Sequence, residues 1–326
     1  MKTAAITGIT GQDGSYLAEL LLEKGYKVLG LYRRTSMEDK HRFENIKDIL
    51  NNPNLKMVEA DVTDYFSLQH LFKLYTIDEF YNLAAQSHVG TSFISPETTH
   101  QINSTGVLNC LEIIRSLSPK TRFYQASTSE LYGDNTNAPQ SETTAFQPVS
   151  PYACSKLCAH NFVINYRKAY GLHASCGILF NHESPRRGEK FVTRKVTKAV
   201  ARIKLGLQDK LELGNLHSMR DWGYAKEYVE GMWLMLQQDQ PDDYVLATGE
   251  THTIQELVEY AFSLAGLDWK KYVSLAESEM RPSEVPLLCG DYTKAKTKLG
   301  WEPKTRFKEL IKLMYETDLQ KETKTI

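Results

Sequence analysis

The feature that most constrains this fold is a glycine-rich loop between the first apolar stretch of the chain and its first helical segment. Ala4–Thr7 is typical of a short buried strand, and Gly8-Ile9-Thr10-Gly11-Gln12-Asp13-Gly14 leads from it into a helical segment, Ser15–Lys24. Glycines at such a turn let backbone N–H groups approach a pyrophosphate at a helix N-terminus. A loop placed between strand and helix in this way predicts a dinucleotide-binding site.

Strand-like and helix-like segments alternate as far as residue 180. The expected strands are Lys27–Leu31, Lys56–Glu59, Glu79–Leu83, Arg122–Ala126 and Ala174–Leu179. The expected helices are Tyr65–Leu74, Thr98–Leu117 and one that opens at Ser150. Because strands separated by helices of this length pair in parallel, we expect an α/β fold built on a doubly wound, parallel, Rossmann-type sheet.

After about Asn181 the alternation becomes irregular. Helices are expected at Phe191–Leu205, Ala225–Leu236 and Thr253–Leu264, and Asp243–Ala247 is expected to return to the sheet as a strand. We expect residues 1–180, with a return segment at about 223–249, to form the dinucleotide-binding domain. Residues 181–222 and 250–326 are expected to form a smaller, irregular α/β C-terminal substrate domain.

Charge and composition exclude several classes of partner. The formal net charge of −1 at pH 7 gives no overall basic field, which argues against nucleic acid and against an anionic membrane surface. No apolar run approaches the roughly 18 residues of a membrane span, and the N-terminus lacks the apolar region of a signal peptide. The five cysteines are odd in number and never spaced Cys-x2-Cys. They predict reduced thiols in a cytoplasmic protein and no metal site.

The end of the second strand indicates which dinucleotide is bound. Enzymes that use NAD place an acidic residue there for the ribose 2′-hydroxyl, whereas this strand ends in Arg33 and Arg34, followed by Thr35 and Ser36. Two guanidinium groups suit a 2′-phosphate and predict NADP as the cofactor. The alternative is an ordinary pair of surface arginines.

Two further strand ends place polar or small residues at the same edge of the sheet. Asp61 and Val62 follow the third strand, where the carboxylate of Asp61 could accept a hydrogen bond from an adenine amino group. After the fourth strand come small or polar residues that would let backbone approach the cofactor riboses: Leu83, Ala84, Ala85, Gln86 and Ser87. The alternative for each is an ordinary turn at a strand end.

The fifth strand ends in Ser127-Thr128-Ser129-Glu130, where open α/β sheets bind their ligands. Ser127 and Glu130 have the spacing of a capping box, but the residues that follow are rich in helix breakers, which disfavours that reading. In the functional alternative, the hydroxyl of Thr128 holds a substrate oxygen and Glu130 acts as a general base or acid.

The helix that opens at Ser150, with Pro151 in its first turn, places Tyr152 and Lys156 on one face. A fixed ammonium one turn from a phenol is expected to favour the phenolate and lower the pKa of Tyr152. The spacing alone is weak, since Tyr292 and Lys296 share it and are interpreted as a solvated helix face.

Taken together, these motifs resemble the extended short-chain dehydrogenase/reductase family. Within it, several segments are similar to the GDP-mannose 4,6-dehydratases: Gly8–Glu19, Asn82–Val89, Tyr124–Gly133, Ile178–Arg194 and Met219–Trp222. The resemblance runs nearly from end to end. It implies conversion of GDP-mannose to GDP-4-keto-6-deoxymannose by internal hydride transfer through tightly bound NADP.

The resemblance also implies roles for individual residues. Tyr152, with Lys156, takes the proton of the C4 hydroxyl, Thr128 holds the C4 oxygen, and Glu130 removes the C5 proton as water leaves C6. His182 and Arg187 approach the cofactor, to which Tyr152 and Lys156 also bind. The residues implied to contact the GDP-sugar are Ser87, Thr128, Asn181, Val192, Lys195, Arg220, Arg281 and Glu284.

Three alternatives stay open at this point. One is a bifunctional dehydratase that also reduces its 4-keto product, a second is a GDP-sugar epimerase, and a third is a non-catalytic NADP-binding sensor or scaffold. By the same resemblance we expect a homodimer or homotetramer, with Thr98–Leu117 and Tyr152–Tyr170 as the helices that pair between subunits.

Overall fold

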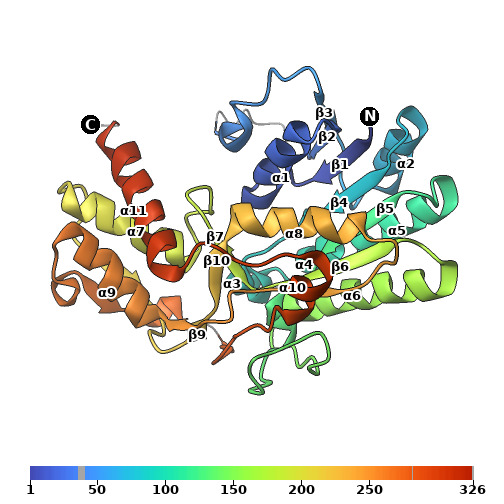
Figure 1. The fold of residues 1–326 in the computed structure, drawn as a ribbon. Coiled ribbons are helices and arrows are strands. Elements are labelled where there is room, and N and C mark those ends of the chain that lie inside the picture. Colours follow the sequence, from blue (N-terminus) through green and yellow to red (C-terminus); the bar gives the residue numbers. More distant parts are fainter. Residues whose placement is uncertain (36–40, 281, 325–326) are drawn as a thin grey trace.

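The computed structural model describes residues 1–35, 41–280 and 282–324 (Figure 1). Its centre is a parallel sheet of seven strands in the order β11-β6-β5-β4-β1-β2-β3. The strands are β1 (Thr3–Thr7), β2 (Lys27–Tyr32), β3 (Leu55–Glu59), β4 (Glu79–Asn82), β5 (Arg122–Ala126), β6 (Ala174–Leu179) and β11 (Tyr244–Leu246). The predicted doubly wound fold is therefore confirmed, and each strand lies within one or two residues of its predicted bounds.

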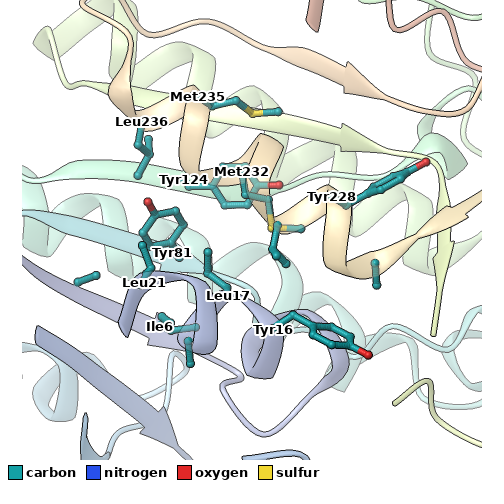
Figure 2. Packing of buried hydrophobic residues seen from close by; sticks show 14 of the residues in the cluster. Ile6, Tyr16, Leu17, Leu21, Tyr81, Tyr124, Tyr228, Met232, Met235 and Leu236 are labelled. Carbon is teal, nitrogen blue, oxygen red and sulfur yellow. The ribbon is translucent and has the colours of Figure 1, made fainter. Parts of the chain in front are cut away.

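Helices cover both faces of this sheet. On one face α1 (Gln12–Glu23) packs beside α8 (Ala225–Gln237), and on the other lie α2 (Tyr65–Leu74), α5 (Gly106–Leu117) and α6 (Pro151–Tyr170). Side chains that alternate along a strand supply the two cores, because successive residues point to opposite faces. Tyr81 and Tyr124 face α1 and α8 (Figure 2), whereas their neighbours Phe80 and Phe123 face α2, α5 and α6.

The segment expected to be one helix, Thr98–Leu117, is divided. It consists of α4 (Pro96–His100), a π-helical turn (Gln101–Thr105) and α5, and it is preceded by the short α3 (Val89–Ile94). Asn103 in the π turn accepts a hydrogen bond from the main-chain N–H of Gln86 at 2.9 Å and donates to the Ser155 hydroxyl at 3.2 Å. The wider turn thus presents an amide that ties the loop after β4 to α6, and both of these segments belong to the site described below.

The less regular part of the chain has a helical core of its own. It is formed by α7 (Val192–Lys204), α9 (Ile254–Ala265) and α11 (Phe307–Thr323), which pack on one another. Asp318 of α11 is 1% exposed and accepts hydrogen bonds from Thr197 at 2.7 Å and from Arg194 at 2.6 Å. Neither α11 nor α10 (Thr293–Leu299) was predicted as a bounded helix. The solvated face predicted for Tyr292 and Lys296 is confirmed for Lys296, which is exposed, but is wrong for Tyr292, which is half-buried beside Trp301.

Three small two-stranded sheets accompany these helices. β7 (Asn181–Glu183) pairs with β10 (Trp222–Tyr224), β8 (Leu211–Leu213) with β13 (Val273–Leu275), and β9 (Met219–Arg220) with β12 (His252–Thr253). β7 follows β6 after a single residue. The chain therefore passes directly from β6, the strand next to the edge strand β11, into the irregular part.

All five cysteines are free thiols; Cys110 and Cys176 are buried and Cys154 is exposed. Among the residues that the structure describes, no helix combines the length and apolar character that crossing a bilayer requires. A cytoplasmic location stays a prediction.

Candidate active site

The carboxyl ends of β1, β2, β4, β5 and β6 open onto one cavity of about 1000 Å³, whose opposite wall comes from α7, β8, β9 and α9. Parallel strands bring their carboxyl ends to one edge of a sheet, which explains why residues distant in sequence meet here. The predicted site residues that line this cavity are Gly8, Thr10, Gly11, Gln12, Asp13, Gly14, Arg33, Asp61, Val62, Leu83, Ala84, Ala85, Ser87, Thr128, Glu130, Tyr152, Lys156, Asn181, His182, Arg187, Val192, Lys195, Arg220 and Glu284.

Four predicted residues are not among them. Ile9 is fully buried in the core beneath the glycine loop, and the Gln86 amide donates to the His88 carbonyl and the Thr99 hydroxyl. Arg34 is exposed and does not line the cavity. Arg281 lies outside the described residues. The cofactor contacts of Ile9, Arg34 and Gln86 therefore stay predictions that the cavity lining does not support.

The glycine loop has the close approaches that a dinucleotide-binding turn needs. Gly8 has φ +68°, and a Cβ on Gly14 would stand 2.3 Å from the Gly8 carbonyl oxygen. Only glycine fits either position. The N-cap residue of α1 is Gly11, which has no side chain to cap the helix, so the N–H groups of its first turn fit a phosphate as acceptor. The loop thus fits the pyrophosphate of a dinucleotide.

Arg33 lines the far end of the cavity together with Arg42, a residue that was not predicted. The Arg42 guanidinium lies 4.9 Å from the ring centroid of Tyr32 and donates to the Thr35 hydroxyl at 3.3 Å. Asp61, at the end of β3, already accepts hydrogen bonds from the N–H and hydroxyl of Thr63, at 2.9 and 2.8 Å. The carboxylate is therefore fixed in place, and its other oxygen suits an adenine amino group.

The four candidate catalytic residues come together where β5 meets α6. Ser150 caps α6 as predicted, its hydroxyl accepting the Ala153 N–H at 3.1 Å. Thr128, rather than Ser127, caps the single 3-10 turn Ser129–Leu131 by accepting the Glu130 N–H at 3.2 Å. The capping-box alternative for Ser127 is therefore wrong. The four side chains, which lie in residues between 4% and 8% exposed, are Thr128, Glu130, Tyr152 and Lys156.

Burial dominates the titration of the Tyr152–Lys156 pair. It raises the pKa of Tyr152 to about 12; a hydrogen bond with Thr128 opposes this rise and the charge of Glu130 adds to it. The Lys156 ammonium donates to the Ala126 carbonyl at 2.6 Å, and burial lowers its pKa to about 8. The predicted lowering of the Tyr152 pKa is therefore wrong for the protein by itself, because burial is the largest cause and raises that pKa.

His182 ties the cofactor end of the cavity to the irregular part of the chain. Its Nε2 lies 2.8 Å from a carboxylate oxygen of Asp13, and its Nδ1 lies 2.7 Å from the carbonyl oxygen of Phe180. Both partners are acceptors, so only the doubly protonated imidazolium satisfies both. Burial alone would lower the pKa of His182, but the charge and hydrogen bond of Asp13 outweigh it and raise that pKa. The glycine loop and β7 thus share a buried ion pair.

The remaining predicted substrate residues occupy the opposite wall. The Asn181 side-chain oxygen is buried and has no hydrogen-bond partner among the described residues, as expected of an acceptor kept for a ligand. Lys195 Nζ lies 2.8 Å from Glu279, and Arg220 lies 2.7 Å from Glu284. The guanidinium of Arg187 lies 3.6 Å from the centroid of the Phe191 ring.

Sequence reasoning missed some of the lining. His88 accepts the Thr91 N–H at 3.1 Å, caps α3 and lines the cavity between the strand ends and Phe191. Its position directly after Gln86 and Ser87 is the signal that would have found it. Glu279 and Met280 line the cavity from a turn far along the chain, and no local pattern marks them.

Comparison with known proteins places this site in a family. Residues 5–314 match the family described as GDP-mannose 4,6 dehydratase. The chain is 53% identical to GDP-mannose 4,6 dehydratase 1 of Arabidopsis thaliana, covering 98% of this chain and 90% of that protein. It is 50% identical to GDP-mannose 4,6-dehydratase of Yersinia enterocolitica (98% and 94% covered) and 47% identical to the Homo sapiens protein (98% and 92% covered).

Solved structures agree on the fold. A UDP-glucose 4-epimerase of Thermotoga maritima, solved with UDP-glucose, superposes with a TM-score of 0.85 at 27% identity, covering 98% of this chain and 99% of that one. A dTDP-glucose 4,6-dehydratase of Bacillus anthracis, solved with NAD, gives a TM-score of 0.86 at 23% identity, covering 99% and 98%. These similarities in sequence and fold, over nearly the whole chain, show that it belongs to the GDP-mannose 4,6-dehydratase family.

Proposed function

We propose that this protein removes water from GDP-mannose to give GDP-4-keto-6-deoxymannose, with NADP as its bound cofactor. One observation carries the proposal: Thr128, Glu130, Tyr152 and Lys156 lie in the same cavity as a glycine loop shaped for a dinucleotide. Oxidation, elimination and reduction at neighbouring carbons of a sugar require three kinds of group: a hydroxyl that holds the sugar, a carboxylate, and a phenol–ammonium pair.

The cofactor would be held along the sheet edge. Gly8, Gly11 and Gly14 would receive the pyrophosphate, Asp61 the adenine, and Arg33 the 2′-phosphate that distinguishes NADP from NAD. Arg42 adds a second guanidinium at that end, which supports NADP. When bound, NADP supplies a hydride acceptor for the C4 hydrogen and a hydride donor for C6.

The protein's own groups move the protons. Tyr152 takes the proton of the C4 hydroxyl, and Thr128, which already bonds the phenol, holds the C4 oxygen. Lys156 is mostly an ammonium at neutral pH, since its pKa is about 8, and as a cation it favours the phenolate. Glu130 removes the C5 proton and passes it to the departing C6 hydroxyl, which leaves as water; once C6 has received its hydride, C5 takes up a proton from solvent. A single buried carboxylate serves both steps.

The opposite wall would hold the nucleotide sugar. Lys195 and Arg220 supply cations for the diphosphate, and Asn181 supplies a buried acceptor for a sugar hydroxyl. Ser87, Val192 and Glu284 complete the proposed contacts. In the same proposal residues 1–180 with 223–249 form the cofactor domain, and residues 181–222 with 250–326 form the substrate domain.

A homodimer or homotetramer belongs to the same proposal. α5 and α6 pack side by side on one face of the sheet, and pairing with the same two helices of a second copy would form a four-helix bundle. The molar mass of the purified protein, measured by light scattering, tests this part.

Product analysis in deuterated water tests the activity. The purified protein is incubated with GDP-mannose and catalytic NADP+. Loss of one water, a new C6 methyl group and deuterium at C5 are the expected result. Glu130→Gln should abolish deuterium incorporation and lower turnover by at least about 10²-fold, while GDP binding stays at the wild-type level.

Three other outcomes would contradict the proposal. A product isomeric with GDP-mannose would indicate an epimerase. In a parallel reaction supplied with NADPH, its stoichiometric consumption would indicate a bifunctional dehydratase and reductase. If GDP-mannose stayed unchanged while NADP was found bound, the cofactor assignment would hold and the substrate assignment would be wrong.

A further inference from the structure

Resting on the function proposed above, we propose that Glu279 is an internal counter-anion for Lys195 that the substrate's diphosphate must displace. Glu279 then limits the affinity of the site for diphosphates. Its removal is expected to tighten binding, which is the opposite of what loss of a structural contact would do.

Lys195 and Glu279 meet across the cavity. Lys195 lies in the first turn of α7, its Nζ is 2.8 Å from a carboxylate oxygen of Glu279, and both residues line the cavity. The two side chains are 28% and 42% exposed. An ion pair as exposed as this contributes little to stability, so a ligand that brings more negative charge can replace the carboxylate.

The position of Glu279 is set by the backbone. It ends a 3-10 turn (Glu277–Glu279) that follows β13, and β13 pairs with β8. At the start of that turn the Ala276 N–H donates to the Leu213 carbonyl at 2.9 Å. A Cβ on Gly214 would stand 2.6 Å from the Glu279 carbonyl oxygen. Because its main chain lies directly against β8, Glu279 stays beside the site when its carboxylate leaves Lys195.

Arg220, the other proposed diphosphate cation, is built in differently. It is 5% exposed, and besides Glu284 its guanidinium donates to the carbonyls of Met219 and Val285, at 3.0 and 2.8 Å. The bond to Val285 ties β9 to the segment that pairs with it at Leu287, so displacing this guanidinium would disturb the fold. We therefore assign the exchangeable counter-anion to Glu279 and not to Glu284.

A diphosphate on Lys195 would stand within a few ångströms of the displaced carboxylate and repel it. Removing one negative charge at that distance in a partly solvated site is expected to tighten GDP binding about 3- to 10-fold. The gain should shrink as salt is added, because exposed charges are screened.

The test is calorimetric titration of the full chain with GDP at low ionic strength. Glu279→Gln keeps the shape and removes the charge, and is expected to bind GDP about 3- to 10-fold more tightly than wild type. Glu277→Gln is the matched control. Glu277 is exposed in the same turn and forms no ion pair with a described residue, so its replacement should change the affinity less than about twofold.

Lys195→Met separates the two levels of the proposal. It is expected to weaken GDP binding at least about 10-fold and to remove most of the gain from Glu279→Gln in the double variant. Unchanged GDP binding in Lys195→Met would overturn both the proposed role of Lys195 and this inference. A weakened Lys195→Met combined with unchanged or weaker binding in Glu279→Gln would overturn the role of Glu279 alone. Glu279→Asp, which keeps the charge, should bind GDP as wild type does.

Discussion

Lys156 is a buried cation whose removal is expected to make the protein inactive and yet more stable. Lys156 is 4% exposed, and its ammonium has the Ala126 carbonyl as a partner at 2.6 Å. Burial lowers its pKa from 10.5 to about 8, so the folded protein holds the charged form against a penalty. We expect Lys156→Met to remove this penalty.

The magnitude follows from the pKa. The fall from 10.5 to about 8 corresponds to about 3 kcal/mol, at about 1.4 kcal/mol for each tenfold change in acidity. The Ala126 carbonyl loses its partner in the variant, which costs about 1 kcal/mol and leaves a net gain of about 2 kcal/mol. With about 2.1 cal/mol/K of unfolding entropy per residue over 326 residues, the unfolding temperature should rise by about 3 °C.

The pH dependence gives a second check. Below pH 8 the lysine is charged in the folded and the unfolded chain, so the penalty is complete. Between about pH 8 and 10.5 the folded protein loses the proton first, and wild type gains stability relative to the variant until the difference disappears.

Scanning calorimetry at pH 7 and pH 9.5 measures both effects. Lys168→Met is the matched control, because Lys168 is exposed on the same helix, and its unfolding temperature should equal that of wild type. A lower unfolding temperature for Lys156→Met at pH 7, or a difference at pH 9.5 as large as the one at pH 7, would refute the reasoning. Turnover should fall by at least about 10²-fold in Lys156→Met alone.

Other substitutions test the cofactor end of the site. Arg33→Ser is expected to weaken NADP binding about 10-fold and NAD binding less than twofold. Arg34 lies outside the cavity, so Arg34→Ser should weaken NADP binding less. Fluorescence titration of each variant with both cofactors measures these affinities. His182→Gln should lower the free energy of unfolding in urea, relative to wild type, most strongly near pH 6, and this difference should narrow above pH 6.5. The pKa of His182 is raised in the folded protein, so the imidazolium contributes its full stabilisation below pH 6.5 and loses it as pH rises through the folded pKa. Gly14→Ala should abolish cofactor binding and lower the free energy of unfolding by about 1–3 kcal/mol, since its Cβ would meet a main-chain oxygen at 2.3 Å; Gly11→Ala, with 3.3 Å available, should do less in the same assays.

Local sequence patterns were sufficient to predict the strands of the large sheet. Runs of apolar residues bounded by turn formers gave β5 and β6 with the observed bounds, because strand length and burial are local properties of such runs. The π turn after α4 was beyond that reasoning, since it accompanies the contacts of Asn103 with Gln86 and Ser155 from two other segments. Its cause is tertiary.

The candidate site divides in the same way. Residue types and spacing identified Glu130, Tyr152 and the glycines, because their chemistry is visible in the motif. The predicted direction of the Tyr152 pKa shift was wrong because burial raises this pKa, and a spacing of four residues does not reveal how deeply a side chain is buried. The pairing of Lys195 with Glu279 joins two segments with no local relation, so only the fold reveals it.

The late position of α8 and β11 in the chain also bears on how the protein folds as it is synthesised. Before residues 225–246 emerge, the face that carries Ile6, Tyr81 and Tyr124 lacks the Met232 and Leu236 side chains that cover it (Figure 2). A nascent chain that ends at residue 180 therefore holds every glycine and strand end of the cofactor site but leaves an apolar sheet face in water. The ribosome must therefore synthesise the chain as far as residue 246 of 326 before this face is covered.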